Sequence, residues 1–205
     1  MDNTLLHSLK NRPHVVILGA GASVATIFNG DKNGNRIYAM ADFIDKLKLD
    51  SILNSVILST NSRNLEDVYS ELYERKDPEC ENVRRKLENK IEKYFSTLEL
   101  SDSPSIYDFL LLSLRNKDLI ISFNWDDLLL QARRRVQQIT NNLPEMAFLH
   151  GNIGVGYCQN DMGYGLKQNR CNICGDFYVP SQLLYPIKKK DYNSSPPIKK
   201  TMGWN

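Results

Sequence analysis

The sequence predicts an α/β protein with a Rossmann-like parallel sheet flanked by helices, a helical insertion at about 38–118 and a small cysteine-containing module. Short apolar stretches rich in β-branched residues recur along the chain, as is typical of buried strands. Each stretch ends in glycine or polar residues, and segments with helical spacing of apolar residues separate them. In such folds ligands bind beyond the carboxyl ends of the strands.

The first strand is expected at 15–19, where "VVIL" runs into "GAGAS". Gly19 and Gly21 permit positive φ and let the backbone approach a phosphate closely, while Ser23 adds a hydroxyl group. Val24 breaks the Gly-x-Gly-x-x-Gly dinucleotide fingerprint. The stretch alone therefore fits a phosphate-binding turn and a merely structural tight turn equally well. The segment 26–37 is rich in Gly, Asn and Asp, which predicts a loop.

Apolar residues at three- and four-residue spacing predict helices over 39–58, 64–76, 79–98 and 101–117. The last of these begins with capping residues and is expected to place Ile106, Phe109, Leu110 and Leu114 on one face.

Two further strands are predicted at 118–124 and 146–151, on either side of a helix at 126–139. The three strand ends should then bring 19–23, Asn124 to Asp127, and His150 with Gly151 to one edge of the sheet. Simpler interpretations stay open, since Asp126 and Asp127 suit helix capping and a lone histidine is more often structural.

Composition excludes several classes of function. The net charge of +2 gives no bulk attraction to nucleic acid, and the basic runs at 133–135 and 188–190 are interpreted as solvated faces. No apolar stretch reaches membrane-spanning length, and residues 1–13 lack the apolar core of a signal peptide. We therefore expect a cytoplasmic protein that binds neither membranes nor nucleic acid directly.

Helical periodicity is lost from residue 151 onward. In a reducing compartment the Cys-x-x-Cys pair Cys171 and Cys174 indicates metal or redox chemistry before a disulfide. Cys158 is a third candidate zinc ligand and Asp161 a fourth; reduced, inert thiols are the alternative. We expect a small module at 151–180 and an extended segment at 181–205.

The ordered set "GAGAS", "NWD" and "HG" resembles the sirtuin (silent information regulator) family over roughly residues 13–190. It is most similar to the sirtuin-like NAD hydrolases of bacterial anti-phage defence, which have "GAGAS" where deacetylases have Gly-Ala-Gly-Ile-Ser. The chain lacks the deacetylases' Pro-Asp-Phe-Arg segment and has one Cys-x-x-Cys pair instead of two. It also lacks the Gly-Tyr-Ser-type turn and later acid of the adenosine pocket, which is consistent with truncation of a longer domain.

This resemblance implies an NAD-binding domain at 1–150 that cleaves the nicotinamide–ribose bond. It implies that NAD is the substrate, that Asn124 holds the ribose hydroxyls and positions water, and that His150 accepts a proton. Asp126 would bind the nicotinamide carboxamide, and the diphosphate would lie on Gly19, Ala20, Gly21, Ala22 and Ser23. NAD depletion in defence, with a homo-oligomer or a partner defence protein, is the implied role. A protein deacylase and a non-catalytic NAD- or ADP-ribose-binding module are the alternatives.

Overall fold

The computed structural model describes residues 12–188; residues 1–11 and 189–205 lie outside the described part. Of the extended segment expected at 181–205, only 181–188 can therefore be assessed, and this stretch has neither helix nor strand. No helix within 12–188 is both long and apolar enough to cross a membrane.

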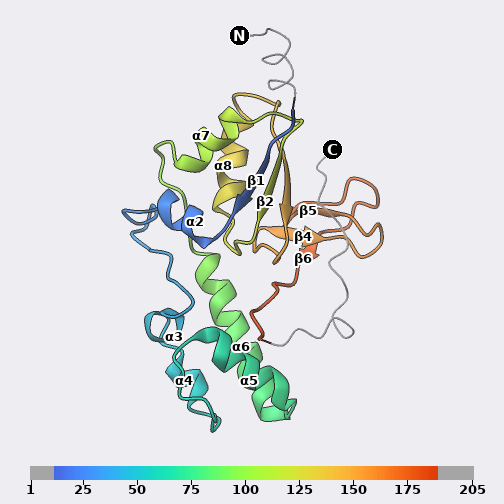
Figure 1. Cartoon of the computed structure of the whole chain (residues 1–205). Helices are drawn as coiled ribbons and strands as arrows, with labels where there is room; N and C mark the ends of the chain where they lie inside the picture. The colour runs from blue at the N-terminus through green and yellow to red at the C-terminus, as the bar shows by residue number, and fades with distance from the viewer. Residues whose placement is uncertain (1–11, 189–205) are drawn as a thin grey trace.

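The core of the fold is a parallel sheet with the strand order β1-β2-β3, which confirms the predicted α/β class (Figure 1). The strands are β1 (Val15–Leu18), β2 (Leu119–Ser122) and β3 (Glu145–Phe148). Leu18 pairs with Ser122, and Ser122 with Phe148, so the three strands end level with one another. The loops that follow them therefore emerge side by side.

The outer strand β1 is less buried than predicted. Val15 and Ile17 are 59% and 67% exposed, whereas Leu18 is buried. Figure 1 shows α7 (Ile106–Ser113) and α8 (Leu128–Val136) along one side of the sheet. The prediction of a fully buried strand was wrong because, among the described residues, one face of β1 is left uncovered.

The glycine-rich stretch forms a helix and not an irregular turn. α2 (Ala20–Thr26) begins directly after Gly19, which is its N-cap in an extended conformation with φ −114°. Neither Gly19 nor Gly21 has a positive φ. The expectation of positive φ at these glycines was therefore wrong, and the strand ends one residue earlier than predicted.

The insertion between β1 and β2 contains α3 (Phe43–Lys46), α4 (Asp50–Leu53), α5 (Leu65–Arg75) and α6 (Pro78–Phe95), as well as α7. The helix expected over 39–58 is broken into two single turns, with Lys48 at φ +53° between them. α6 is the best-formed helix: Asp77 caps it by accepting from Cys80 N at 2.8 Å, and every third or fourth residue is buried.

The buried face of α7 differs from the prediction. Ile106 and Phe109 are 55% and 63% exposed, whereas Tyr107 and Leu111 are buried; Leu110 and Leu114 are half-buried. A capping box between Ser105 and Asp108 fixes the first turn of the helix. α7 therefore faces the protein with Tyr107, Asp108 and Leu111, and polar contacts fix its first turn.

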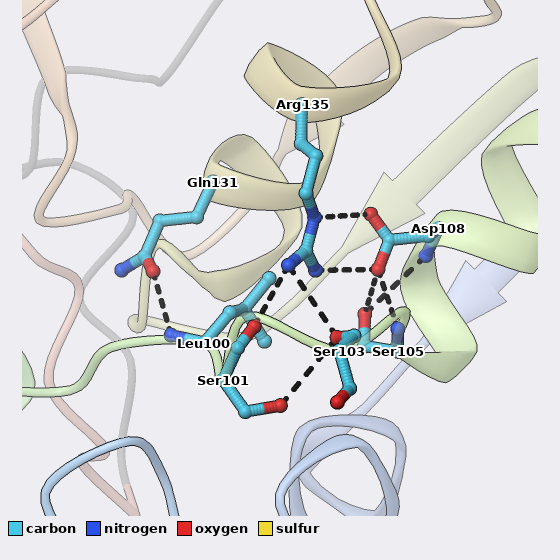
Figure 2. A network of polar contacts seen from close by, with 7 residues as sticks. All are labelled: Leu100, Ser101, Ser103, Ser105, Asp108, Gln131 and Arg135. Atoms are coloured by element: carbon cyan, nitrogen blue, oxygen red, sulfur yellow. Dashed lines mark hydrogen bonds and ion pairs between the residues drawn. The ribbon is translucent and has the colours of Figure 1, made fainter.

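Figure 2 shows how the first turn of α7 is held to α8. Arg135 donates to both carboxylate oxygens of Asp108, at 2.9 Å and 2.5 Å, and also to the Ser101 carbonyl oxygen at 2.7 Å. Gln131, one turn earlier on α8, accepts from Leu100 N at 2.9 Å. A bidentate pair of this kind fixes orientation as well as distance. The loop before α7 and the helix itself are thus locked onto α8.

A second, antiparallel sheet with the order β5-β4-β6 follows the parallel one. Its strands are β4 (Val155–Tyr157), β5 (Tyr164–Leu166) and β6 (Val179–Pro180). At Gly165 a Cβ atom would lie 2.1 Å from Cε2 of Tyr178, so only glycine fits beneath that ring. The sequence did not predict these strands because two or three residues are too few to establish a period.

Candidate active site

A cavity of about 350 Å³ opens where the loops after β1, β2 and β3 meet. Three residues predicted as site residues contribute polar side chains to its wall: Asn124, Asp126 and His150. Ala20 lines it from the start of α2, and most of the remaining wall is apolar and aromatic. The structure thus joins the three predicted strand ends around one space.

The side chain of Asn124 is oriented by contacts with the first helix. Its Nδ2 donates to the Gly19 carbonyl oxygen at 3.0 Å and to Ser23 Oγ at 2.8 Å. Because a carbonyl oxygen can only accept, the amide nitrogen must lie on this side. The Asn124 Oδ1 atom, an acceptor, is then left for the cavity.

Ser23 is the centre of a buried chain of hydroxyl groups. Its Oγ lies 2.8 Å from Tyr107 Oη and donates to Asp126 Oδ1 at 3.0 Å. Tyr107 and Ser23 are 1% and 0% exposed. Sequence reasoning missed Tyr107, because an aromatic residue on an apolar helix face gives no sign of its hydroxyl partners.

Asp126 is a carboxylate in an unfavourable place for charge. Burial raises its pKa to about 6, although Ser23 and the backbone N–H of Leu128 both donate to Oδ1 and oppose the shift. The bond from Leu128 N, at 3.3 Å, also means that Asp126 contributes to the start of α8. The capping interpretation is therefore partly right, and it coexists with a position on the cavity wall.

Asn152, which is fully buried, holds the loop after β2 by hydrogen bonds. Its Nδ2 donates to the Asp126 carbonyl oxygen, and its Oδ1 accepts from Gly154 N at 2.9 Å. The backbone adds a bond from Ile153 N to the Trp125 carbonyl oxygen at 2.9 Å. The loops carrying Asp126 and His150 are thus joined to each other. The sequence analysis missed Asn152, and the only signal for it was its position directly after His150 and Gly151.

His150 follows β3 and packs edge-on against Phe123, with 5.0 Å between ring centroids. The next residue, Gly151, has φ +75°, and a Cβ there would lie 2.6 Å from the Gln182 carbonyl oxygen. Only glycine permits both this backbone conformation and this approach. The glycine of "HG" therefore lets the segment near 182 cross close to the histidine.

Residues 181–188, named here the cover segment, close one side of the cavity. Leu184 N donates to the His150 carbonyl oxygen at 2.9 Å, and Lys188 N donates to Ser70 Oγ on α5 at 2.9 Å. Tyr185 is buried against Trp125 and Tyr69, with ring centroids 5.1 Å and 5.0 Å away. The cover segment thus bridges the sheet and the helical insertion.

Trp125 places a buried ring N–H group at the cavity wall. The residue is 5% exposed and lines the cavity, and its Nε1 has no acceptor among residues 12–188. A buried donor without a partner costs about 1–3 kcal/mol. An acceptor supplied by a ligand or by water would remove that cost.

The residues expected to hold a diphosphate are only partly at the cavity. Of 19–23, Ala20 lines it, while Gly19 and Ser23 reach it through their bonds to Asn124. Gly21 is exposed, and a Cβ on it would meet nothing within 4 Å. The surface outside the first turn of α2 is therefore open.

Four side chains next to the second sheet could hold a metal ion. One ligand atom from each of Cys158, Asp161, Cys171 and Cys174 lies within 4.8 Å of the others. Backbone N–H groups of Cys174 and Ile173 lower the pKa of the Cys171 thiol, whereas Asp161 raises the pKa of Cys174 to about 12. Three thiols and a carboxylate this close cannot all ionise without a cation, and sulfur with oxygen donors suits Zn²⁺. The set fits a structural zinc site.

No protein-family profile matches the chain, and neither does any curated protein. Among solved structures the chain is similar to one described as the crystal structure of a Sir2 homolog–NAD complex, at 19% sequence identity and a TM-score of 0.37. The match covers 90% of this chain and 62% of that one, so the chain spans less than two thirds of that protein's length. A likeness this distant does not establish a family for the chain.

Proposed function

We propose that the chain hydrolyses NAD⁺ at the bond between nicotinamide and ribose. The bond from the ribose C1 carbon to the nicotinamide nitrogen breaks, and water supplies the new oxygen, giving nicotinamide, ADP-ribose and a proton. One observation carries the proposal: Ala20, Asn124, Asp126 and His150, from three motifs far apart in the sequence, meet at one cavity. Their order along the chain is that of the sirtuin-like set.

The polar groups of the cavity match what this reaction needs. Asn124 presents an acceptor, Oδ1, that suits a ribose hydroxyl group or the attacking water. His150 is the proposed group that takes the proton released when water adds. The carboxamide of nicotinamide has an NH₂ donor, which a carboxylate oxygen of Asp126 can accept.

The apolar walls support a planar, aromatic ligand. Phe43, Phe95, Trp125 and Tyr185 all contribute rings to the cavity wall. Such a wall excludes bulk water and strengthens the few polar contacts inside. NAD enters this proposal as the substrate, with its diphosphate directed to the first turn of α2, where helix N–H groups have no acceptor within the helix.

Hydrolysis is favoured over protein deacylation by the cover segment. A deacylase must admit an acylated side chain of a second macromolecule to the ribose, whereas water needs no such entrance. Residues 184–187 line the cavity, and the cover segment is held at Leu184, which bonds to His150, and at Lys188, which bonds to Ser70. The experiment that distinguishes the two reactions adds an acetylated peptide and measures whether nicotinamide release changes.

The test of the proposal is NAD turnover by matched variants. Purified protein is incubated with NAD, and nicotinamide and ADP-ribose are quantified by liquid chromatography. His150→Ala should stop release of both products, while His14→Ala should not, because His14 precedes β1 at the opposite edge of the sheet. Equal turnover in the two variants would refute the role of His150.

We also propose that zinc holds the module around the second sheet. Cys158, Asp161, Cys171 and Cys174 would be its ligands, and the metal would supply structural cohesion only. A role in NAD depletion during anti-phage defence, in a homo-oligomer or with a partner protein, is the proposed biological setting. Expression of active and His150→Ala forms in bacteria, followed by measurement of cellular NAD, tests that setting.

A further inference from the structure

Tyr107 is a buried tyrosine hydroxyl that the proposed reaction does not yet use. It lies on α7, which contributes no residue to the cavity wall. Its Oη lies 2.8 Å from Ser23 Oγ and 3.3 Å from Asn124 Nδ2, and its ring is 1% exposed. The Tyr107 hydroxyl thus lies beside Asn124, which lines the cavity, and beside Ser23, which bonds to both Asn124 and Asp126. This placement suggests an orienting role.

The directions of the hydrogen bonds can be worked out from the donors available. Ser23 has one proton, which it donates to Asp126 Oδ1 at 3.0 Å. Ser23 Oγ must then accept from Tyr107, so the chain runs from Tyr107 to Ser23 to Asp126. Asn124 Nδ2 also donates to Ser23 Oγ, at 2.8 Å, which places two donors on that oxygen.

This chain of hydrogen bonds orients the side chains of Asn124 and Asp126, which follow β2. Asp126 Oδ1 is occupied by Ser23 and by Leu128 N, which leaves Oδ2 for a ligand. The Asn124 amide nitrogen is occupied by Gly19 and Ser23, which leaves Oδ1. We propose that Tyr107 is a positioning residue, whose hydroxyl group orders Ser23 so that Asn124 and Asp126 each present an acceptor oxygen to the cavity. The inference rests on the proposed NAD cleavage for its meaning but not for its test.

The position of Tyr107 is itself fixed from two sides. Asp108, the next residue, is held by Arg135 of α8 and by the capping box with Ser105, so the first turn of α7 cannot rotate freely (Figure 2). This rotation buries Tyr107 and Leu111 and leaves Ile106 and Phe109 exposed. The polar contacts around Asp108 therefore aim the Tyr107 hydroxyl at Ser23.

Removing the Tyr107 hydroxyl group should change the pKa of Asp126. In a chain of hydrogen bonds each donor polarises the next, so loss of Tyr107 Oη weakens the bond from Ser23 to Asp126. Less stabilisation of the carboxylate means a higher pKa for Asp126. The negative charge of Asp127 also raises that pKa. The other titratable groups near the carboxyl or on the cavity wall are Tyr38, Glu66, Tyr94, His150 and Tyr185.

The experiment compares Tyr107→Phe with Tyr69→Phe. Both changes remove one hydroxyl from a buried ring, but Tyr69 Oη bonds to Glu88 in the helical insertion and has no contact with Ser23. The Asp126 carboxyl is titrated by ¹³C NMR in aspartate-labelled protein without NAD, with Asp126→Asn providing the assignment. Tyr107→Phe should raise the Asp126 pKa by about half a unit or more, and Tyr69→Phe should leave it unchanged. An unchanged Asp126 titration in Tyr107→Phe overturns the proposal.

A second arm measures NAD cleavage across pH. Tyr107→Phe should lower kcat by roughly threefold to tenfold, the effect of one net hydrogen bond, and move the acidic limb of the profile to higher pH. In a Ser23→Ala background the same change should add little, because Tyr107 acts through Ser23. Additive losses would contradict the proposal. Absence of cleavage in the parent protein would refute the proposed function alone, since the NMR titration needs no turnover.

Discussion

The strand-end site and the module around the second sheet hold their polar groups in opposite ways. Asn124, Asp126 and Asn152 are each satisfied by several bonds from neighbouring loops, so the site is ordered by the protein itself. In the module, the thiols of Cys158, Cys171 and Cys174 cluster with one another and with the Asp161 carboxylate. One region is therefore ordered before any ligand binds, whereas the other brings together ionisable groups that the proposed zinc ion would hold.

The largest loss of stability is expected when the module loses its zinc or a zinc ligand. Structural zinc contributes about 10–16 kcal/mol of apparent binding energy in small zinc-dependent peptides. Cys171→Ser, or a strong chelator, should therefore loosen 151–180 and lower thermal stability. Elemental analysis should find about one zinc per chain, as a single tetrahedral site requires.

Two comparisons sharpen this prediction. Cys80→Ala should keep the zinc, because Cys80 is buried at the start of α6, outside the cluster. NAD cleavage in Cys171→Ser should fall only indirectly. A metal-free protein whose 151–180 segment stays protected in hydrogen exchange would mean that packed, reduced thiols hold the module.

The next largest effect is expected on the rate of NAD cleavage, without loss of the fold. Asn124→Ala and His150→Ala should each slow NAD cleavage by about 10²–10⁴-fold, the usual loss when a positioned general base or its partner is removed. Circular dichroism should show little change, because both side chains lie on the wall of a preformed cavity. Asn141→Ala, on an exposed loop, is the control for Asn124→Ala. Parent-like rates in both site variants would rule out these roles.

A smaller effect concerns stability against pH. The raised pKa of Asp126 means that the folded state holds this proton up to about pH 6, while the unfolded chain releases it near 3.8. Stability from this group is therefore highest at low pH and falls as pH rises from about 4 to 6. Asp126→Asn should raise the free energy of unfolding at pH 7 by on the order of 2–3 kcal/mol, and by much less at pH 4.

Urea unfolding at the two pH values measures this difference. Asp102→Asn, on a carboxylate whose side chain is 89% exposed, should show no such pH-dependent gain. The same Asp126→Asn variant should release nicotinamide more slowly than the parent. Stability equal to the parent at both pH values would mean that the carboxylate is solvated and not buried.

The smallest effect concerns the open surface of α2. Gly21→Val adds a side chain where a Cβ meets nothing within 4 Å, and valine costs less than glycine inside a helix. The thermal midpoint should therefore stay the same or rise slightly. Calorimetric titration with ADP-ribose should nevertheless show at least about tenfold weaker binding, if phosphate lies against this turn. Unchanged affinity in the folded variant would leave the turn with a structural role only.

The sequence allowed the strand ends to be predicted because parallel strands place their carboxyl ends together. Asn124, Asp126 and His150 followed from that rule, and the structure brings them to one cavity. The conformation of the glycine turn was not predictable in this way, since Gly19 and Gly21 permit helix and turn alike.

Long-range contacts account for the rest of what the sequence did not reveal. Periodicity placed Ile106 and Phe109 inside, yet α7 buries Tyr107 and Asp108, whose polar groups have their partners on α2 and α8. The cover segment has no periodic pattern at all, and Tyr185 is buried by stacking on rings far away in the sequence. Such features are set by tertiary partners, which local spacing does not encode.

We propose that this cavity cleaves NAD with water as the acceptor. The most direct measurement incubates the full chain with NAD, with and without an acetylated peptide, and follows nicotinamide, ADP-ribose and peptide mass. Hydrolysis should give equal amounts of nicotinamide and ADP-ribose, at the same rate in both reactions, with the peptide unchanged. Nicotinamide release that requires the peptide, with loss of its acetyl group, would contradict hydrolysis. NAD binding without any release would contradict catalysis.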